Sequence, residues 1–168
     1  SISNNTIGSN ATKRSYFALS SDNTGIIRAI LRYAGGANSI QLLSNSAVFS
    51  TSTWYHITFT HDGTTPKLYL NGSLLTDVTE SGSSPSSFLN LIPVTTVQLG
   101  RLEYNNNGTI ATSGLFDGKI DEVAIFDYAL SARQIKQDIY DATTTGKTAD
   151  LNNISNLTAP VAWYRMGD

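Results

Sequence analysis

The chain has 168 residues with a formal net charge of -2, and only 14% of its residues are charged. This length is enough for one domain with a substantial core, and the absence of any Lys/Arg cluster argues against a nucleic-acid partner. No apolar run approaches the ~20 residues of a membrane-spanning helix, and the lack of cysteine excludes disulfides and thiolate metal sites.

Alternating hydrophobicity and turn residues predict a series of short strands. Segments Thr79–Ser87 and Tyr104–Ser113 are predicted to be long flexible loops, where binding residues are usually found. Apolar residues lie on both faces of Lys119–Phe126, so we expect that strand to be covered on both sides. The expected strands are Tyr16–Ser20, Ile26–Tyr33, Ser39–Leu43, Trp54–His61, Lys67–Asn71, Ser73–Asp77, Val94–Gly100 and Lys119–Asp127.

A short helix is predicted to follow the last of these strands. Ser131 and Gln134 have the spacing of a capping box, in which each residue hydrogen-bonds the backbone of the other. Leu130 and Ile135 are spaced to form a hydrophobic staple around the same helix start. These signals place the helix from Ala132 to Tyr140.

Five segments follow one another along the chain: Thr53–Thr60, Asp62-Gly63, Lys67–Gly72, Val97–Arg101 and Leu115–Tyr140. Taken in this order, they resemble the laminin G-like and pentraxin-like domains of the concanavalin A-like lectin/glucanase group. The resemblance implies an all-β jelly-roll sandwich of two antiparallel sheets with one short C-terminal helix. It also implies that Trp54 packs in the core and that Tyr55, Ile57 and Phe59 lie between the sheets.

We expect residues 1–140 to form the jelly roll, with the opening strands of the family missing from it. Residues 141–168 are predicted to be a Thr/Asn-rich linker followed by a strand, because Pro160–Asp168 resembles the first strand of another laminin G-like module. Two alternatives stay open: this strand docks on the same domain, or it begins a next module. Docking is favoured because Val161, Trp163 and Tyr164 would be costly to leave in water.

Catalysis is not expected, although one branch of this fold hydrolyses glycans. A retaining glycosidase needs two carboxyl groups ~5.5 Å apart, whereas Asp121 and Asp127 would lie ~20 Å apart on an extended strand. Asp121 and Glu122 are instead expected to hydrogen-bond their strand to a neighbouring loop. His56 and His61 point to opposite strand faces, which excludes a shared metal site or a catalytic dyad.

The resemblance to pentraxins implies a weak calcium site. Pentraxins bind Ca²⁺ through an Asp-Asn pair in an early hairpin turn and through acidic and amide residues after a Leu-Gly strand end. Asp22 and Asn23 match the pair, and Glu103, which follows Leu99-Gly100, is the candidate from the second segment. The alternative is a metal-free hairpin turn, because Asp, Asn and Gly favour such turns by themselves.

Sugar binding would need an exposed aromatic ring with amides beside it. We therefore predict a non-catalytic recognition or adhesion module that binds a surface glycan or polysaccharide, on a secreted, cell-surface or virion-surface protein such as a phage tail or capsid decoration. Copies of itself or neighbouring modules are further expected partners. The rival prediction is a purely structural, self-assembling module without a ligand. The candidate sugar-binding residues are Tyr104, Asn105, Asn106, Asn107 and Tyr33.

Overall fold

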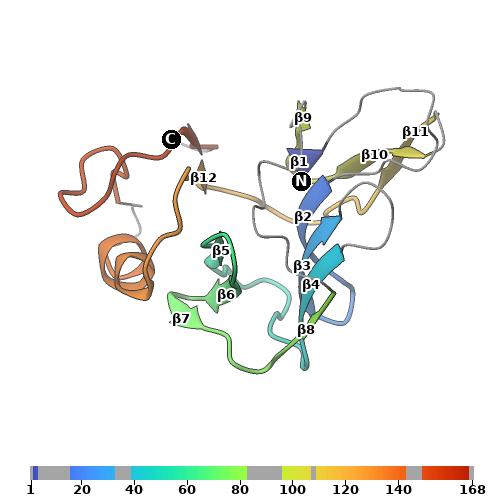
Figure 1. Cartoon of the computed structure of the whole chain (residues 1–168), viewed down its shortest axis with the longest axis horizontal. Coiled ribbons are helices and arrows are strands. Elements are labelled where there is room, and N and C mark those ends of the chain that lie inside the picture. Colours follow the sequence, from blue (N-terminus) through green and yellow to red (C-terminus); the bar gives the residue numbers. More distant parts are fainter. Residues whose placement is uncertain are drawn as a thin grey trace. The chain divides into compact units, whose positions relative to one another are not determined.

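The computed structural model of the chain describes residues 2–3, 16–32, 39–82, 96–106, 109–142 and 149–166. These residues form strands β1 to β13 and one short helix, η1, and each strand pairing is antiparallel (Figure 1). The prediction of an all-β fold with one short C-terminal helix is therefore confirmed. The chain forms two compact units: a first unit of Ser1–Thr53, Gly63–Thr65 and Asp77–Gly118, and a second unit of Trp54–Asp62, Pro66–Thr76 and Lys119–Asp168.

The first unit contains a six-stranded sheet with the strand order β8-β4-β3-β2-β1-β9. A separate hairpin pairs β10 (Leu102–Asn106) with β11 (Thr109–Ser113). The six strands of the sheet are β1 (Ile2–Ser3), β2 (Tyr16–Ser21), β3 (Ile27–Arg32), β4 (Ser39–Ser44), β8 (Val78–Ser81) and β9 (Thr96–Val97).

One face of the six-stranded sheet carries the core of the first unit. Ala29 lies opposite Leu42 and Leu31 opposite Ile40, and all four side chains are at most 3% exposed. Ile30, between the two β3 residues, is only half-buried because successive side chains point to opposite faces of a strand. A slip of one residue would turn the apolar set away from the core, so this pattern sets the register of the sheet.

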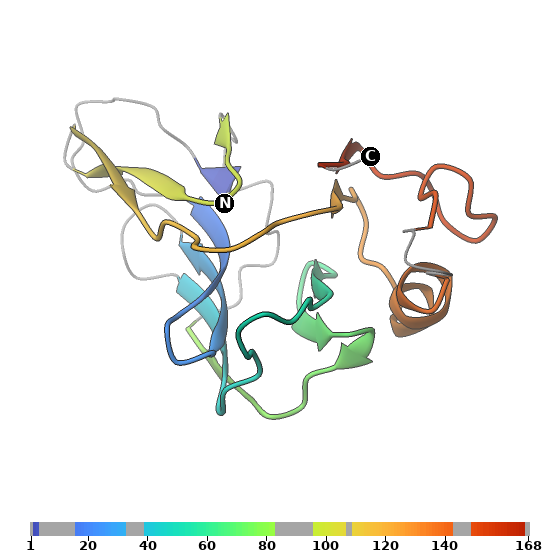
Figure 2. The same cartoon turned by 180° about the vertical axis from the view of Figure 1, so that it is seen from behind.

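The second unit contains a three-stranded sheet, a two-stranded sheet and the helix (Figure 2). The three-stranded sheet has the order β5-β6-β7, and the other sheet pairs β12 with β13. The elements are β5 (Ile57–His61), β6 (Pro66–Leu70), β7 (Ser73–Leu74), β12 (Val123–Ile125), β13 (Ala162–Tyr164) and η1, a π-helix over Gln134–Tyr140.

Strand β6 is buried on both of its faces. Leu68, which is 1% exposed, lies opposite Phe59 of β5. Tyr69 points to the other face and forms a buried cluster with Leu130 and Ile135, which bracket the start of the helix. The helix is thereby anchored to this face of β6, and the predicted pair Leu130 and Ile135 shares one apolar cluster.

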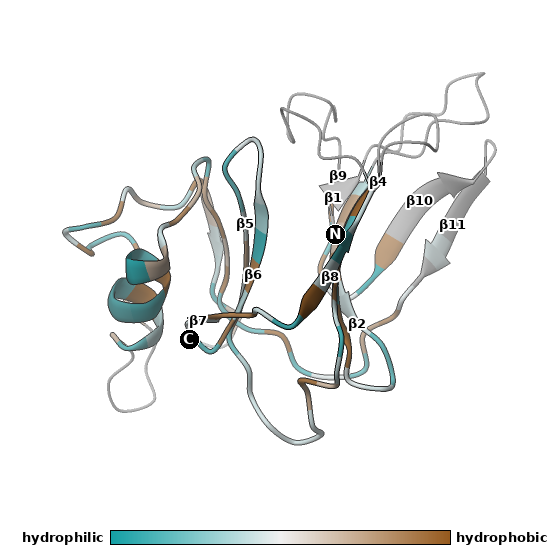
Figure 3. Ribbon diagram, turned by 60° about the horizontal axis from the view of Figure 1, so that its bottom comes forward, coloured by the Kyte–Doolittle hydropathy of each residue, from teal (hydrophilic) through white to brown (hydrophobic). Residues whose placement is uncertain are grey.

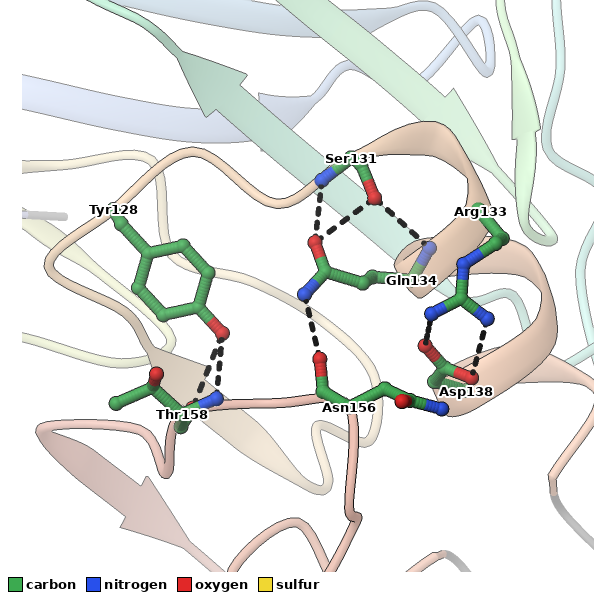
Figure 4. A network of polar contacts seen from close by, with 7 residues as sticks. All are labelled: Tyr128, Ser131, Arg133, Gln134, Asp138, Asn156 and Thr158. Carbon is green, nitrogen blue, oxygen red and sulfur yellow. Dashed lines mark hydrogen bonds and ion pairs between the residues drawn. The ribbon is translucent and has the colours of Figure 1, made fainter.

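The hydrogen bonds predicted for the helix start are present, although η1 begins at Gln134 and not at the predicted Ala132 (Figure 4). The backbone N–H of Ser131 donates to Gln134 Oε1 over 2.9 Å, and the N–H of Gln134 donates to Ser131 Oγ over 3.3 Å. These two reciprocal bonds are the capping box. Hydrophilic and hydrophobic residues both occur along η1, as an amphipathic helix requires (Figure 3).

The connection between β6 and β7 is a two-residue turn of Asn71 and Gly72. Their φ angles of 50° and 76° are both positive, which is the backbone that an Asn-Gly hairpin turn adopts. A Cβ on Gly72 would lie 2.8 Å from Lys136 Cδ and 3.0 Å from Tyr140 Cβ. Glycine is therefore needed here both for the turn and for the close approach of η1.

The last strand of the chain pairs with β12. Val123 lies opposite Tyr164, Ala124 opposite Trp163 and Ile125 opposite Ala162. The segment after Pro160 thus contributes a strand to the second unit, and whether it belongs to this domain or to a next module stays a prediction. The domain limits at residues 140 and 141 stay a prediction.

Several predicted element limits are wrong, as the strand pairings and one backbone dihedral angle show. The strand expected over Trp54–His61 begins only at Ile57, and the one expected over Lys119–Asp127 spans only Val123–Ile125. The second of these strands begins late because Glu122 has a φ of 51°, outside the extended region. Its three residues are half-buried, so the strand is not covered on both faces as predicted. Two expected loops are instead paired: part of Thr79–Ser87 lies in β8, and part of Tyr104–Ser113 in the β10–β11 hairpin.

Trp54 does not lie in the core, contrary to the prediction from the family pattern. Its side chain is 62% exposed. The strand ladder begins three positions later, so Trp54 is not held against the sheet as a strand residue would be. Tyr55, Ile57 and Phe59 are half-buried in the second unit.

Candidate functional site

The turn between β2 and β3 is organised by the side chain of Asp22. Its Oδ1 accepts hydrogen bonds from the Thr24 hydroxyl at 2.6 Å, the Thr24 N–H at 2.9 Å and the Ile26 N–H at 3.1 Å. The hydrogen bond from the Thr24 hydroxyl lowers the pKa of Asp22 below its ordinary value, since it favours the ionised carboxylate. Asp22 is thus a fixed negative charge whose Oδ1 already serves the turn, and Asn23 is an exposed residue beside it.

The segment after β4 lies against this turn. The N–H of Val48 donates to Gly25 O over 2.9 Å, and Gly25 has a φ of 83°. A Cβ on Gly25 would lie 2.7 Å from Phe49 O, so the contact needs glycine for space as well as for conformation. Residues 45–49 and the β2–β3 turn therefore belong to one end of the sheet.

A second polar cluster at this end joins β4 to β8. Asn45 Nδ2 donates to Asp77 Oδ1 over 2.8 Å, and the Thr79 hydroxyl donates to Asn45 Oδ1 over 2.6 Å. The Ser46 hydroxyl lies 3.4 Å from Asp77 Oδ2. These side chains are exposed but hold one another in place, so they present a pre-arranged polar surface.

We call Asp22, Asn23, Asn45, Asp77 and Thr79 the turn-end surface. It offers two carboxylates, two amides and a hydroxyl at one end of the six-stranded sheet. Carboxylate oxygens and amide N–H groups keep unused hydrogen-bonding capacity after the contacts above. Asn45, Asp77 and Thr79 were not predicted, because no local motif marks residues that only the β4–β8 pairing brings together.

The predicted sugar-binding residues lie elsewhere in the first unit. Tyr104, Asn105 and Asn106 belong to β10, with their backbones paired to Ala111, Ile110 and Thr109, while Asn107 and Tyr33 lie outside the described residues. Glu103, the third candidate calcium ligand, pairs with Thr112 in the same hairpin. The β10–β11 hairpin and the β2–β3 turn lie at opposite ends of the first unit (Figure 1). The structure does not bring Asp22 and β10 together, and calcium binding stays a prediction.

Asp121 and Glu122 form a corner in the second unit. Asp121 Oδ1 accepts from the N–H of Glu122 at 2.9 Å and from the N–H of Met166 at 3.2 Å. Glu122 Oε2 accepts from the indole N–H of Trp163 at 2.7 Å, and Glu122 Oε1 lies 3.6 Å from Arg165 Nε. The expected structural role of both carboxylates is confirmed, although their partners lie in the C-terminal segment and not in a loop beside the strand.

The two histidines do not form a site together in the described part of the chain. Burial lowers the pKa of His56, whose ring centroid lies 5.7 Å from that of Tyr140 on η1. His61 is the last residue of β5. Over the described ranges, no group of three or more His, Cys, Asp or Glu residues could hold a metal ion, and no helix is long and apolar enough to cross a membrane.

Comparison with known proteins gives a family and one solved structure. A laminin G family model, described as the concanavalin A-like lectin/glucanases superfamily, matches residues 2–136. The crystal structure of an S-layer domain-containing protein (residues 221–444) from Clostridium thermocellum ATCC 27405 is similar at 25% identity with a TM-score of 0.40. That likeness covers 76% of this chain and 56% of the other, so the chain spans little more than half the length of that domain. No curated protein matches.

Proposed function

The chain belongs to the concanavalin A-like lectin/glucanase superfamily, and from this premise we propose that it is a non-catalytic recognition module for a surface glycan. The observation that carries the proposal is the turn-end surface, where carboxylates and amides are already positioned to hydrogen-bond hydroxyl groups. Because these side chains are held before any ligand arrives, little conformational entropy is lost on binding.

The composition of the chain supports the same partner. Only 14% of the residues are charged, so a ligand with many neutral hydroxyl groups meets few competing charges. Asp22 and Asp77 can each accept hydrogen bonds from sugar hydroxyls, and Asn23 and Asn45 can both donate and accept. We assign the module to an extracellular setting, on a cell surface or virion surface, where such glycans occur.

The proposed absence of catalysis rests on the way the carboxylates of the second unit are used. Asp121 and Glu122 are adjacent in the chain, and their oxygens hold backbone and side-chain groups of the C-terminal segment. A glycosidase pair needs one carboxyl group to donate a proton and the other to attack or to activate water. Groups that are committed to structural hydrogen bonds cannot fill those roles without breaking the corner.

A glycan array, probed with labelled protein with and without Ca²⁺, tests the proposal. Binding to a defined class of glycan is expected. An absence of binding under both conditions would contradict the proposed glycan recognition. Glycan binding that requires Ca²⁺ would support the calcium prediction. A cation that binds only the folded state also raises the Tm, so a calcium titration of the Tm is a second test. A Tm that stays unchanged through the calcium titration would remove calcium from the proposal.

Paired variants locate the binding surface. Asn45→Ala and Asp77→Asn change the turn-end surface, and Tyr104→Ala and Asn106→Ala change the predicted hairpin site at the other end of the unit. We expect the first pair to weaken glycan binding about tenfold, the value of one hydrogen bond to a charged or well-placed group. Loss of binding in the hairpin pair alone would move the site to β10. Thr112→Ala on β11 serves as an exposed control.

A further inference from the structure

The edge of β12 recognises its partner strand through backbone and side chains together. Three residues of β12 pair with Ala162–Tyr164, and the N–H of Val161 donates to Ile125 O over 2.8 Å. At the other end of the segment, Asp121 Oδ1 accepts from the N–H of Met166. Residues 161–166 are thus bound along their whole length, in the way that an added strand binds a sheet edge.

Glu122 makes this edge selective for the residues that occupy it. Its two carboxylate oxygens face different groups, the Trp163 indole N–H at 2.7 Å and Arg165 Nε at 3.6 Å. The Arg165 guanidinium also lies 4.8 Å from the centroid of the Trp163 ring, so one residue pair presents a donor and a cation to one carboxylate. An aromatic residue followed two positions later by a cation therefore complements this corner in shape and in charge.

One hydrogen bond of the corner lies within the corner itself. Glu122 has a φ of 51°, a left-handed conformation that non-glycine residues adopt at a cost. Asp121 Oδ1 accepts the N–H of Glu122 itself at 2.9 Å, which holds that conformation from within the corner. This bond joins two neighbouring residues and does not involve the segment that fills the corner, whose Met166 N–H adds a second hydrogen bond to the same oxygen.

The occupying segment leaves much of its own surface in solvent. Val161 is 61% exposed, Tyr164 43% and Met166 45%. Part of the apolar surface of this segment is therefore already in water, which lowers the cost of releasing it relative to a fully buried strand. Upstream, Tyr128 Oη accepts the Thr158 N–H at 3.2 Å and donates to Thr158 O at 3.1 Å, so the part that can swing out begins after Thr158 (Figure 4).

We propose that the β12 edge with Asp121 and Glu122 is a strand-accepting site that takes residues 161–166 of a second copy of this chain, joining copies through exchanged strands. The chain's own segment fills the site at high effective concentration when molecules are dilute. A second copy competes when molecules are crowded or when the chain's own segment is impaired. The short reach beyond Thr158 means that exchanging copies lie in direct contact. This interaction goes beyond glycan recognition and lies in the second unit, so either can fail without the other.

Two complementary variants test the exchange. Trp163→Ala impairs the strand and leaves the acceptor intact. Glu122→Asn impairs the acceptor, because it removes the carboxylate and shortens the side chain, but Asn tolerates the left-handed backbone at this position. Each variant alone is expected to be monomeric, and an equimolar mixture is expected to contain a one-to-one complex by sedimentation velocity. In the control mixture, an Asp127→Asn protein takes the place of the Glu122→Asn protein. Its strand stays bound in its own intact acceptor, so no complex with the Trp163→Ala protein is expected.

A synthetic peptide of residues 159–166 provides the second measurement. It should raise the Tm of the Trp163→Ala protein, whereas the same peptide carrying Trp163→Ala should not. If the Trp163→Ala protein is unfolded alone, refolding on addition of the peptide supports the proposal equally. A mixture that sediments as two monomers, together with no Tm rise or refolding at millimolar peptide, would overturn it.

Discussion

Two corners of the molecule use a carboxylate to hold a bend in the backbone, but they differ in where the partners come from. In the first unit, Asp22 Oδ1 binds Thr24 and Ile26 of its own turn. In the second unit, Glu122 binds Trp163, which is 41 residues away in the chain. Both carboxylates are structural, but the contacts of the Asp22 side chain are local, whereas those of the Glu122 side chain depend on a strand that is distant in the chain.

The difference shows which contacts depend on the folded state as a whole. Asp22 loses only local hydrogen bonds if the rest of the unit opens, and it is fully exposed. Glu122 is largely shielded, with a side-chain exposure of 17%, so its partners replace water that the fold has removed. Substitutions at non-local contacts should therefore cost more than substitutions at local ones.

The largest effect is expected at Gly72, where a local and a non-local requirement coincide. Gly72→Ala places a Cβ in a left-handed backbone and within 2.8 Å of Lys136 Cδ on η1. We expect a loss of about 3 kcal/mol in the free energy of unfolding, from the backbone strain together with displacement of the helix. Urea denaturation followed by circular dichroism measures it.

Gly100 is the matched control for that substitution. It has a φ of 77°, nearly that of Gly72, but a Cβ added to it meets no atom within 4 Å. Gly100→Ala should therefore cost only the local strain, about 1 kcal/mol. Equal losses at the two glycines would show that the approach of η1 to Gly72 contributes nothing.

The next effect tests the non-local corner directly. Glu122→Ala leaves the indole N–H of Trp163 without its acceptor and removes the ion pair with Arg165. A loss of about 2 kcal/mol is expected, because a shielded donor is left without a partner. Asp127→Ala, an exposed carboxylate near the other end of the same strand, is the control and should stay within about 0.5 kcal/mol of the wild type.

A smaller effect should appear at His56 as a dependence of stability on pH. Burial depresses the pKa of His56 below its ordinary value of 6.5, so the unfolded chain binds a proton more readily than the folded one. Stability is therefore full above pH 6.5 and falls as the pH drops below that value toward the folded-state pKa. In Tm measurements across this range, His56→Gln should reduce the decrease of Tm with falling pH. An unchanged slope would show that other groups cause the decrease.

The smallest effect is expected at the exposed local corner. The pKa of Asp22 lies below its ordinary value of 3.8, so its contribution is present above that pH and is lost as the pH falls through the folded-state pKa. Asp22→Asn keeps an acceptor oxygen for Thr24 and removes the titration, so acid unfolding should become slightly less steep. Asp22→Ala removes the acceptor and should lower the Tm at neutral pH as well. Identical Tm values for the two variants would show that the turn does not need the acceptor.

The sequence alone identifies the elements whose partners lie within a few residues. The capping box of Ser131 and Gln134, the Asn71-Gly72 turn and the Asp22 turn all follow from side chains that reach their own neighbouring backbone. Alternating hydrophobicity over β3 and β4 likewise determines the buried face and the antiparallel, all-β fold class. Each of these signals is local, so it survives in the linear order of residues.

Tertiary structure decides the contacts that depend on which strands pair. Asn45 meets Asp77, 32 residues away, because β4 pairs with β8, and no motif in either segment marks that meeting. Trp54 illustrates the opposite error, since its exposure depends on where the β5–β6 ladder begins and not on its own hydrophobicity. The Glu122–Trp163 corner likewise exists only through the β12–β13 register, because hydrogen-bonded strand pairs place side chains together whatever their separation in the chain.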